Sequence, residues 1–188
     1  MKKIMMIAVI AAAAVSANAQ TWIGGSLGFN TEKTTVDGEK LSSGTSFEIA
    51  PEVGYSLNEN WDVAIKLGYT YSSEKSMTFS GYKATGNYNA FEINPYVRYT
   101  FVKAGNFFAF CDGGVAYSTG HISNIDKNLN QFSVGLNPGI GYKVSPKVSL
   151  VAHIGDLSYT YSWWDDLKNN AFNLNLTNSI SFGAYVAL

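Results

Sequence analysis

Ionisable side chains recur at alternate positions in several segments of the chain. The seven that we expect to form one interior charge network are Glu48, Glu52, Lys66, Glu92, Arg98, Asp112 and His153. Charges inside a protein interior must be paired or hydrated. The set could therefore fill the interior with ion pairs or line a narrow pore. Proton transfer by the carboxylates would need a substrate that we do not expect to reach them.

A second candidate for chemistry surrounds His121. This histidine is close in sequence to Ser118, Ser123 and Asp126, and a hydroxyl beside a base is the arrangement that activates a nucleophile. Any polar segment offers these residue types by chance, so we predict no catalytic residue and no enzymatic activity. Two histidines and one cysteine make a weak case for a metal, and we predict neither metal nor cofactor.

The most conspicuous exposed pattern is the pair Trp163 and Trp164, followed by Asp165 and Asp166. Two interpretations remain open. The tryptophans could anchor the chain at a membrane interface. They could instead contact a partner protein or a glycan, because tryptophan is enriched in interaction hot spots.

The composition excludes several classes of protein. A net charge of −1 leaves no electrostatic footprint for nucleic acid. The single cysteine cannot form an intramolecular disulfide. With 46% hydrophobic and 14% charged residues, the chain is too apolar for disorder. Its 188 residues allow one domain.

The first residues have the pattern of a cleaved signal peptide. Two lysines at positions 2 and 3 precede an apolar run at 4–15, and small residues at 17 and 19 end the segment. As a helix, the run would rise about 18 Å, against about 30 Å for a hydrocarbon core. We therefore predict a signal peptide at 1–19 and one domain at 20–188.

Apolar and polar residues alternate with a period of two, which is the pattern of a β-strand. In the clearest run, 61–71, every odd position is large and apolar or aromatic. The alternation predicts eight strands, at about 21–30, 45–57, 61–72, 88–101, 107–118, 131–144, 148–161 and 172–187. Short turns at 58–60, 102–106 and 145–147 alternate with polar segments at 31–44, 73–87, 119–130 and 162–171, which we predict as loops.

A repeat of hairpin length favours an up-and-down barrel. Pro51, Pro95 and Pro138 each begin the pattern Pro-x-Val/Ile-x-Tyr, at spacings of 44 and 43 residues. A proline in a paired strand removes a ladder hydrogen bond, so we predict a bulge at these positions.

Alternation alone fits a soluble barrel with an apolar interior or a membrane barrel with an apolar exterior. The polar face is rich in Gly, Ala and Ser, which suits the narrow interior of eight strands. The apolar face is too bulky for that interior, and it carries aromatic residues near both strand ends, as expected at the two interfaces of a bilayer. We therefore predict an eight-stranded antiparallel up-and-down transmembrane β-barrel.

This organisation resembles the small eight-stranded outer-membrane β-barrels of Gram-negative bacteria, in particular the porin-family, outer-membrane protein X-like barrel domains. The resemblance rests on the signal peptide, the proline repeat and the Gly-rich segment 111–117. It implies an outer-membrane location, with short turns in the periplasm and long loops outside the cell. The implied partners are outer-membrane lipid and lipopolysaccharide, with an extracellular protein or glycan as a candidate ligand of the loops.

Tight turns set the strand register and therefore the pairing of interior charges. The first short turn places Glu52 directly across from Lys66, and the second places Arg98 one diagonal step from Asp112. We expect these pairs to plug the lumen of a barrel whose role is structural, with surface loops presented for interaction or adhesion. The alternatives are a narrow porin-like channel for small solutes and, less expected, a lipid-modifying enzyme.

Overall fold

The computed structural model describes residues 20–36, 39–79, 82–123, 128–175 and 181–188. The predicted signal peptide and Asp126 lie outside these ranges. The strands are β1 (Thr21–Val36), β2 (Glu39–Ser56), β3 (Trp61–Phe79), β4 (Tyr82–Ala104), β5 (Phe107–Ile122), β6 (Asn128–Lys143), β7 (Val148–His153), β8 (Asp156–Trp164), β9 (Leu167–Asn175) and β10 (Ser181–Ala187). Within these ranges, no helix is long and apolar enough to cross a membrane.

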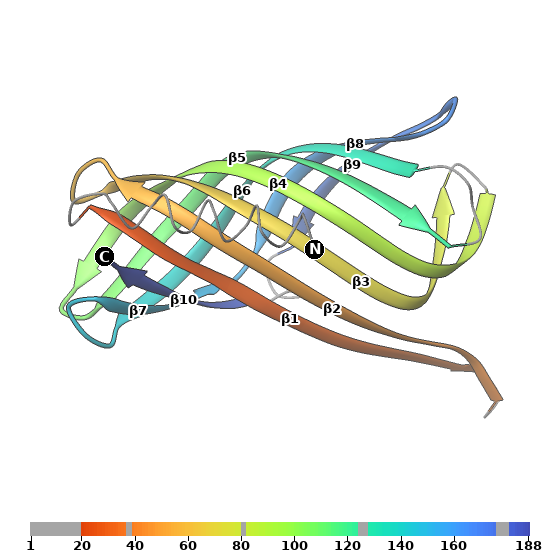
Figure 1. Ribbon diagram of the computed structural model, residues 1–188, viewed down its shortest axis with the longest axis horizontal. Helices are drawn as coiled ribbons and strands as arrows, with labels where there is room; N and C mark the ends of the chain where they lie inside the picture. Colours follow the sequence, from red (N-terminus) through yellow and green to blue (C-terminus); the bar gives the residue numbers. More distant parts are fainter. Residues whose placement is uncertain (1–19, 37–38, 80–81, 124–127, 176–180) are drawn as a thin grey trace.

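The ten strands fill the eight positions of one closed antiparallel barrel (Figure 1). β1 to β6 occupy one position each. β7 and β8 share the seventh, since both pair with β6. β10 and β9 share the eighth, since they pair with β7 and β8 respectively. β1 pairs with β10 and completes the ring, so the predicted eight-stranded antiparallel barrel is confirmed.

The short turns gather at one end of the barrel, together with both described ends of the chain (Figure 1). The backbone N–H of Leu188 donates to the carbonyl of Thr21 at 3.0 Å. In the turn between β2 and β3, Asn58 Oδ1 accepts from the backbone N–H of Asn60 at 2.9 Å. The turn between β4 and β5 uses Gly105 at a φ of 61°, a left-handed conformation that glycine adopts without a Cβ clash.

At the other end, four hairpins stay paired far beyond the predicted strand ends. β3 and β4 remain paired to Phe79 and Tyr82, with a register shift between Ser72 and Lys75. β8 and β9 remain paired to Trp164 and Leu167. The predicted loops at 31–44, 73–87, 119–130 and 162–171 are therefore largely strand. Pairing satisfies the backbone whatever the side chains are. The polar side chains of these four segments therefore indicate contact with water and do not indicate that the strands end.

The predicted bulge at the repeat prolines is wrong for two of the three. The β2–β3 register is the same before and after Pro51, and the β4–β5 register is the same before and after Pro95. In each case the ladder only skips the proline and the residue before it. At Pro138 the facing strand is interrupted instead, between β7 and β8, at Ile154 and Gly155. Because proline has no N–H to donate, the strand ladder mainly leaves short gaps in pairing at these positions.

The outward face is apolar, and aromatic residues lie near both ends. At the short-turn end, the ring centroids of Trp61 and Tyr99 are 4.5 Å apart. At the long-hairpin end, three tyrosine hydroxyls each donate to an asparagine Oδ1 on the neighbouring strand. These pairs are Tyr69 with Asn89, Tyr117 with Asn130, and Tyr159 with Asn170, at 2.9, 3.0 and 2.9 Å.

Candidate functional site in the barrel lumen

An arginine and an aspartate occupy the lumen on the short-turn side. Arg98 on β4 and Asp112 on β5 face each other directly in register and are 4% and 7% exposed. Arg98 donates from Nε to Asp112 Oδ1 and from Nη2 to Oδ2, both at 2.7 Å. This bidentate geometry is the strongest form of such a pair.

The two residues are directly opposite, not one diagonal step apart as predicted. The turn itself closes tightly at Ala104 and Phe107, and the register then shifts by one residue between Thr100 and Val102. A β-bulge adds a residue to one strand and so changes every pairing beyond it.

Four aromatic rings surround the guanidinium of Arg98. Its carbon lies 4.0 Å from the ring centroid of Phe110, 4.9 Å from that of Tyr185, and 5.7 Å from those of Trp22 and Tyr96. All four distances are within the range of cation–π attraction. The charge is therefore held by its carboxylate partner and by ring faces, with little contact with water.

Glycines make room for these rings. A Cβ on Gly54 would clash with the ring of Trp22, and a Cβ on Gly24 would clash with that of Tyr185. At Gly139 an added Cβ would lie 2.8 Å from a ring carbon of Phe110 and 2.8 Å from a backbone oxygen. Large and small inward residues on adjacent strands thus interlock into one layer. We call this layer the floor; it comprises Arg98, Asp112, Trp22, Tyr96, Phe110 and Tyr185.

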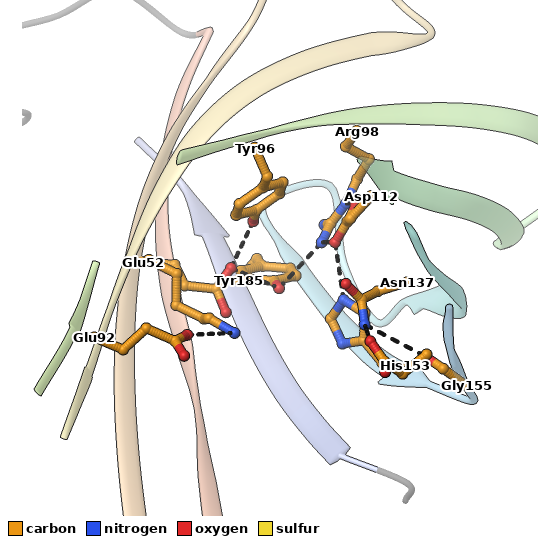
Figure 2. A network of polar contacts seen from close by, with 11 residues as sticks. Glu52, Glu92, Tyr96, Arg98, Asp112, Asn137, His153, Gly155 and Tyr185 are labelled. Atoms are coloured by element: carbon orange, nitrogen blue, oxygen red, sulfur yellow. Dashed lines mark hydrogen bonds and ion pairs between the residues drawn. The ribbon is translucent and has the colours of Figure 1, made fainter. Parts of the chain in front are cut away.

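Two tyrosine hydroxyls of the floor form hydrogen bonds with Glu52. The hydroxyls of Tyr96 and Tyr185 donate to Glu52 Oε2 at 2.6 and 3.1 Å, and Arg98 Nη2 donates to the Tyr185 hydroxyl at 3.3 Å (Figure 2). Sequence reasoning missed both tyrosines as site residues. Their inward positions in the alternation were the available signal.

Lys66 lies opposite Glu52, as predicted, but its ion pair is with Glu92. The Nζ of Lys66 is 3.6 Å from Glu92 Oε1, and both side chains are partly exposed. The predicted ion pair between Glu52 and Lys66 is therefore wrong, since each residue has another partner. Glu52 is occupied by tyrosine hydroxyls, and Gly68 opposite Glu92 leaves space for the Glu92 side chain.

His153 also contacts the floor. It lies on β7 opposite Gly139, as predicted, and its Nε2 is 2.9 Å from Asp112 Oδ2. Its ring meets that of Phe110 edge to face, with centroids 5.3 Å apart. Asp112 thus joins Arg98 and His153, and Figure 2 shows the three side chains close together.

A polar cavity of about 640 Å³ lies above the floor, on the long-hairpin side. Its lining residues with carboxylate, ammonium or imidazole side chains are Glu48, Glu52, Lys66, Glu92, Asp112, His153 and Asp156. The seven predicted network residues are therefore divided: Arg98 belongs to the floor, Asp112 lies at its boundary with the cavity, and the rest line the cavity. Carboxylates outnumber cationic groups in this wall.

Asp156 was missed because the alternation changes phase. His153 faces inward at an odd position, but β8 faces inward at even positions after the interruption at Ile154 and Gly155. Asp156 then accepts from Asn137 Nδ2 at 3.2 Å and from the Ser158 hydroxyl at 2.8 Å. The sequence held two signals of this break: Gly155 within the predicted strand, and the switch of apolar residues from even positions, ending at Ile154, to odd positions, starting at Leu157.

The other candidates lie outside the lumen network. Trp163 and Trp164 are in β8, not in a loop, and the ring of Trp163 stacks on that of Tyr161 at a centroid distance of 5.5 Å. His121 is exposed on β5, three positions from the inward Ser118, whose hydroxyl donates to Gln131 at 3.3 Å.

Comparisons with known proteins agree with this architecture. Among solved structures, Neisserial surface protein A matches with a TM-score of 0.56 at 15% identity, over 91% of this chain and 98% of that one. The Yersinia pestis protein Ail in a phospholipid nanodisc matches with a TM-score of 0.42 at 18% identity, over 90% and 99%. No curated protein sequence matches. The family model for the outer membrane protein beta-barrel domain matches residues 4–178. The chain therefore belongs to this family of outer-membrane β-barrels.

Proposed function

We propose that this protein is a plugged outer-membrane barrel that conducts no solute and has a structural role, presenting its long hairpins for interaction. The observation that carries the proposal is the buried pair of Arg98 and Asp112 within four aromatic rings. Displacing Arg98 or Asp112 would leave the other charge buried without its ion-pair partner, which is costly. The floor is therefore a stable barrier across the lumen.

The proposed orientation places the short turns in the periplasm and the long hairpins outside the cell. Bacterial barrels generally have short periplasmic turns and longer external connections. The aromatic rings near both ends of the outward face fit the two interfaces of a bilayer.

The long hairpins are then the contact surface for lipopolysaccharide and for an extracellular protein or glycan. Trp163 stacks on Tyr161 and lies 6.2 Å from the ring of Tyr117, so it is part of an aromatic patch on the outer wall. This packing favours an interfacial anchor, and the exposed turn at Asp165 and Asp166 is the part of that hairpin that a partner would meet first.

A narrow channel is the second candidate. It is favoured by the 640 Å³ cavity, whose carboxylate-rich wall would attract small cations. Conduction would require the floor to move. A catalytic role is not part of our proposal, because His121 is exposed on the opposite side of β5 from Ser118 and the ring of His153 is directed at Asp112.

Single-channel conductance of the refolded domain, residues 20–188, tests the plug in a planar bilayer. We expect no openings in the parent and openings in a variant with both Arg98→Ala and Phe110→Ala. Lys66→Ala is the matched control, because it removes a lumen charge outside the floor and should stay silent. Steady openings in the parent would overturn the plug and favour the channel.

A further inference from the structure

The last strand of the barrel carries one large inward side chain. The inward residues of β10 are Ser181, Gly183, Tyr185 and Ala187. Tyr185 is 6% exposed and belongs to the floor. Its position matters because β10 pairs with β1 and thereby closes the ring (Figure 1).

The ring of Tyr185 crosses over the first strand. In the strand ladders, Gly24 of β1 is opposite Tyr185 on one side and opposite Glu52 of β2 on the other. A Cβ on Gly24 would clash with the Tyr185 ring, so the ring lies directly over this glycine. Beyond Gly24, the Tyr185 hydroxyl donates to Glu52 Oε2 at 3.1 Å (Figure 2). Tyr185 therefore joins β10 to β2 across β1.

Tyr185 also contacts side chains of β1 and β4. Arg98 Nη2 donates to the Tyr185 hydroxyl at 3.3 Å, and the guanidinium carbon of Arg98 is 4.9 Å from the Tyr185 ring centroid. The ring centroids of Trp22 and Tyr185 are 4.6 Å apart. All these contacts require Tyr185 at one height in the lumen. A displacement of β10 along β1 would therefore break them together.

The inward residues of β1 restrict this height. From the short-turn end they are Trp22, Gly24, Ser26 and Gly28. A slip that keeps the inward face inward moves a strand by two residues. One such slip would place Tyr185 opposite Trp22 and the other opposite Ser26, and both residues carry a Cβ where Gly24 has none. Gly28 would leave room for the ring, but it lies about 13 Å along the strand from Gly24, too far for contact with Arg98.

We propose that Tyr185 is a closure latch, a side chain that selects the register in which β10 joins β1. Gly24 is the matching position on β1, and Glu52 and Arg98 hold the tyrosine once it is in place. The backbone ladder does not distinguish the registers, because the same pattern of hydrogen bonds forms after a slip of two residues. The latch concerns how the barrel closes, so it is independent of the plug proposed above.

The ring and the hydroxyl of Tyr185 have separate roles. The volume of the ring selects the register, because only a glycine leaves room for it. The hydroxyl stabilises the selected register through Glu52 and Arg98. Tyr96 provides the comparison within the floor. Its hydroxyl also donates to Glu52, at 2.6 Å, but it lies on β4, outside the ladder that closes the ring.

Disulfide trapping in the domain 20–188 tests the latch. Cys111→Ala removes the single native cysteine. Ile23→Cys with Val186→Cys reports the native register, because these residues are opposite each other. Ile23→Cys with Ala184→Cys reports the slipped register in which Tyr185 would be opposite Trp22. Opposite Cα atoms are about 4.5–5.5 Å apart, which a disulfide spans, whereas diagonal neighbours at about 7–8 Å are too distant.

Each cysteine pair is oxidised after refolding in phosphatidylcholine vesicles, and mass spectrometry measures the disulfide yield. In the parent we expect a disulfide in the native pair and almost none in the slipped pair. Tyr185→Ala should raise the ratio of slipped to native disulfide about tenfold, because the slip no longer overpacks the lumen. Tyr185→Phe keeps the ring and should keep the parent ratio. Tyr96→Ala is the matched control, since it removes a ring and a hydrogen bond to Glu52 from the same layer and should leave the ratio unchanged.

Trp22→Gly tests the same clash from the other strand if Tyr185→Ala does not refold. It places a glycine opposite Tyr185 in the slipped register and should also raise the ratio several-fold. An unchanged ratio in Tyr185→Ala, or in Trp22→Gly where that variant is needed, would overturn the proposal. An equal rise in Tyr96→Ala or in Tyr185→Phe would overturn it as well. The ratio can be measured whether or not the lumen conducts, so its failure is distinct from failure of the plug.

Discussion

The two halves of the lumen are enclosed by the same strands but are filled differently. On the short-turn side, all eight positions are paired, and large rings lie against glycines until side chains fill the interior. On the long-hairpin side, the inward residues are mainly serine, threonine, asparagine and carboxylates around a cavity of 640 Å³. In the described ranges, the wall on this side also lacks pairing between β1 and β9.

The contrast shows that closing the ring of strands and filling the lumen with side chains are separate properties. The barrel ring holds together through backbone hydrogen bonds, which do not depend on inward side chains. Whether the lumen is dry depends on how much of its volume side chains fill. The rings of Trp22, Phe110 and Tyr185 fill it in the floor, and a smaller buried cluster of Tyr88 and Ile122 lies toward the long hairpins. The floor should therefore carry much more stability per residue than the cavity wall.

The strongest test of this difference is Arg98→Ala. The substitution leaves Asp112, 7% exposed, without its ion-pair partner and with the contact of its Oδ2 to His153 Nε2 at 2.9 Å. Removing one partner of a buried ion pair costs about 3–5 kcal/mol. Urea unfolding followed by tryptophan fluorescence in detergent measures the loss. A loss below about 1 kcal/mol would mean that water reaches Asp112 and that the floor is not dry.

A smaller effect is expected from Tyr96→Phe, which removes the hydroxyl that donates to Glu52 at 2.6 Å. A hydrogen bond to a charged group contributes about 1.5–3 kcal/mol. The matched control is Tyr69→Phe, whose hydroxyl donates to Asn89 on the exposed outer face, and we expect about 0.5 kcal/mol there. Equal losses in the two variants, measured by the same unfolding assay, would contradict the distinction between floor and surface.

Overpacking the floor gives an effect of similar or smaller size. Gly139→Ala would bring a Cβ within 2.8 Å of a backbone oxygen, and such overpacking costs about 1–3 kcal/mol. Gly68→Ala lies beside the cavity, where the nearest atom would be Glu92 Cβ at 3.2 Å. This control should change stability by less than about 1 kcal/mol. The thermal midpoint of unfolding compares the pair, and a control as damaging as Gly139→Ala would show that the cavity wall is equally rigid.

Local sequence patterns predicted the barrel but not all of its polar contacts. Alternation depends on two faces of one strand, so it identified the strands and the inward positions of Glu52, Arg98 and Asp112. The turn between β2 and β3 is regular, and the predicted opposition of Glu52 and Lys66 is confirmed. The pairing of two strands joined by a short turn depends on nearby residues, so it can be predicted from the sequence.

The rest depended on features that local patterns do not carry. The bulge at Thr100 moved Arg98 into direct opposition with Asp112, and the break at Gly155 turned Asp156 inward. Tyr185 reaches Glu52 from a strand 133 residues later in the chain. Such contacts depend on how the ring closes and on the volume left inside it. Neither feature can be predicted from the order of residues along a single strand.

The smallest predicted effect concerns the cavity side. The ion pair of Lys66 and Glu92 has a distance of 3.6 Å, and its side chains are 28% and 36% exposed. A pair of this kind contributes about 0–1 kcal/mol. Lys66→Ala should therefore change the free energy of unfolding little at low salt and still less at 1 M salt, where the screening length is about 3 Å. Unfolding titrations at both salt concentrations measure this. A loss above about 2 kcal/mol that salt does not reduce would mean that the cavity is as dry as the floor, and the two halves would then differ only in shape.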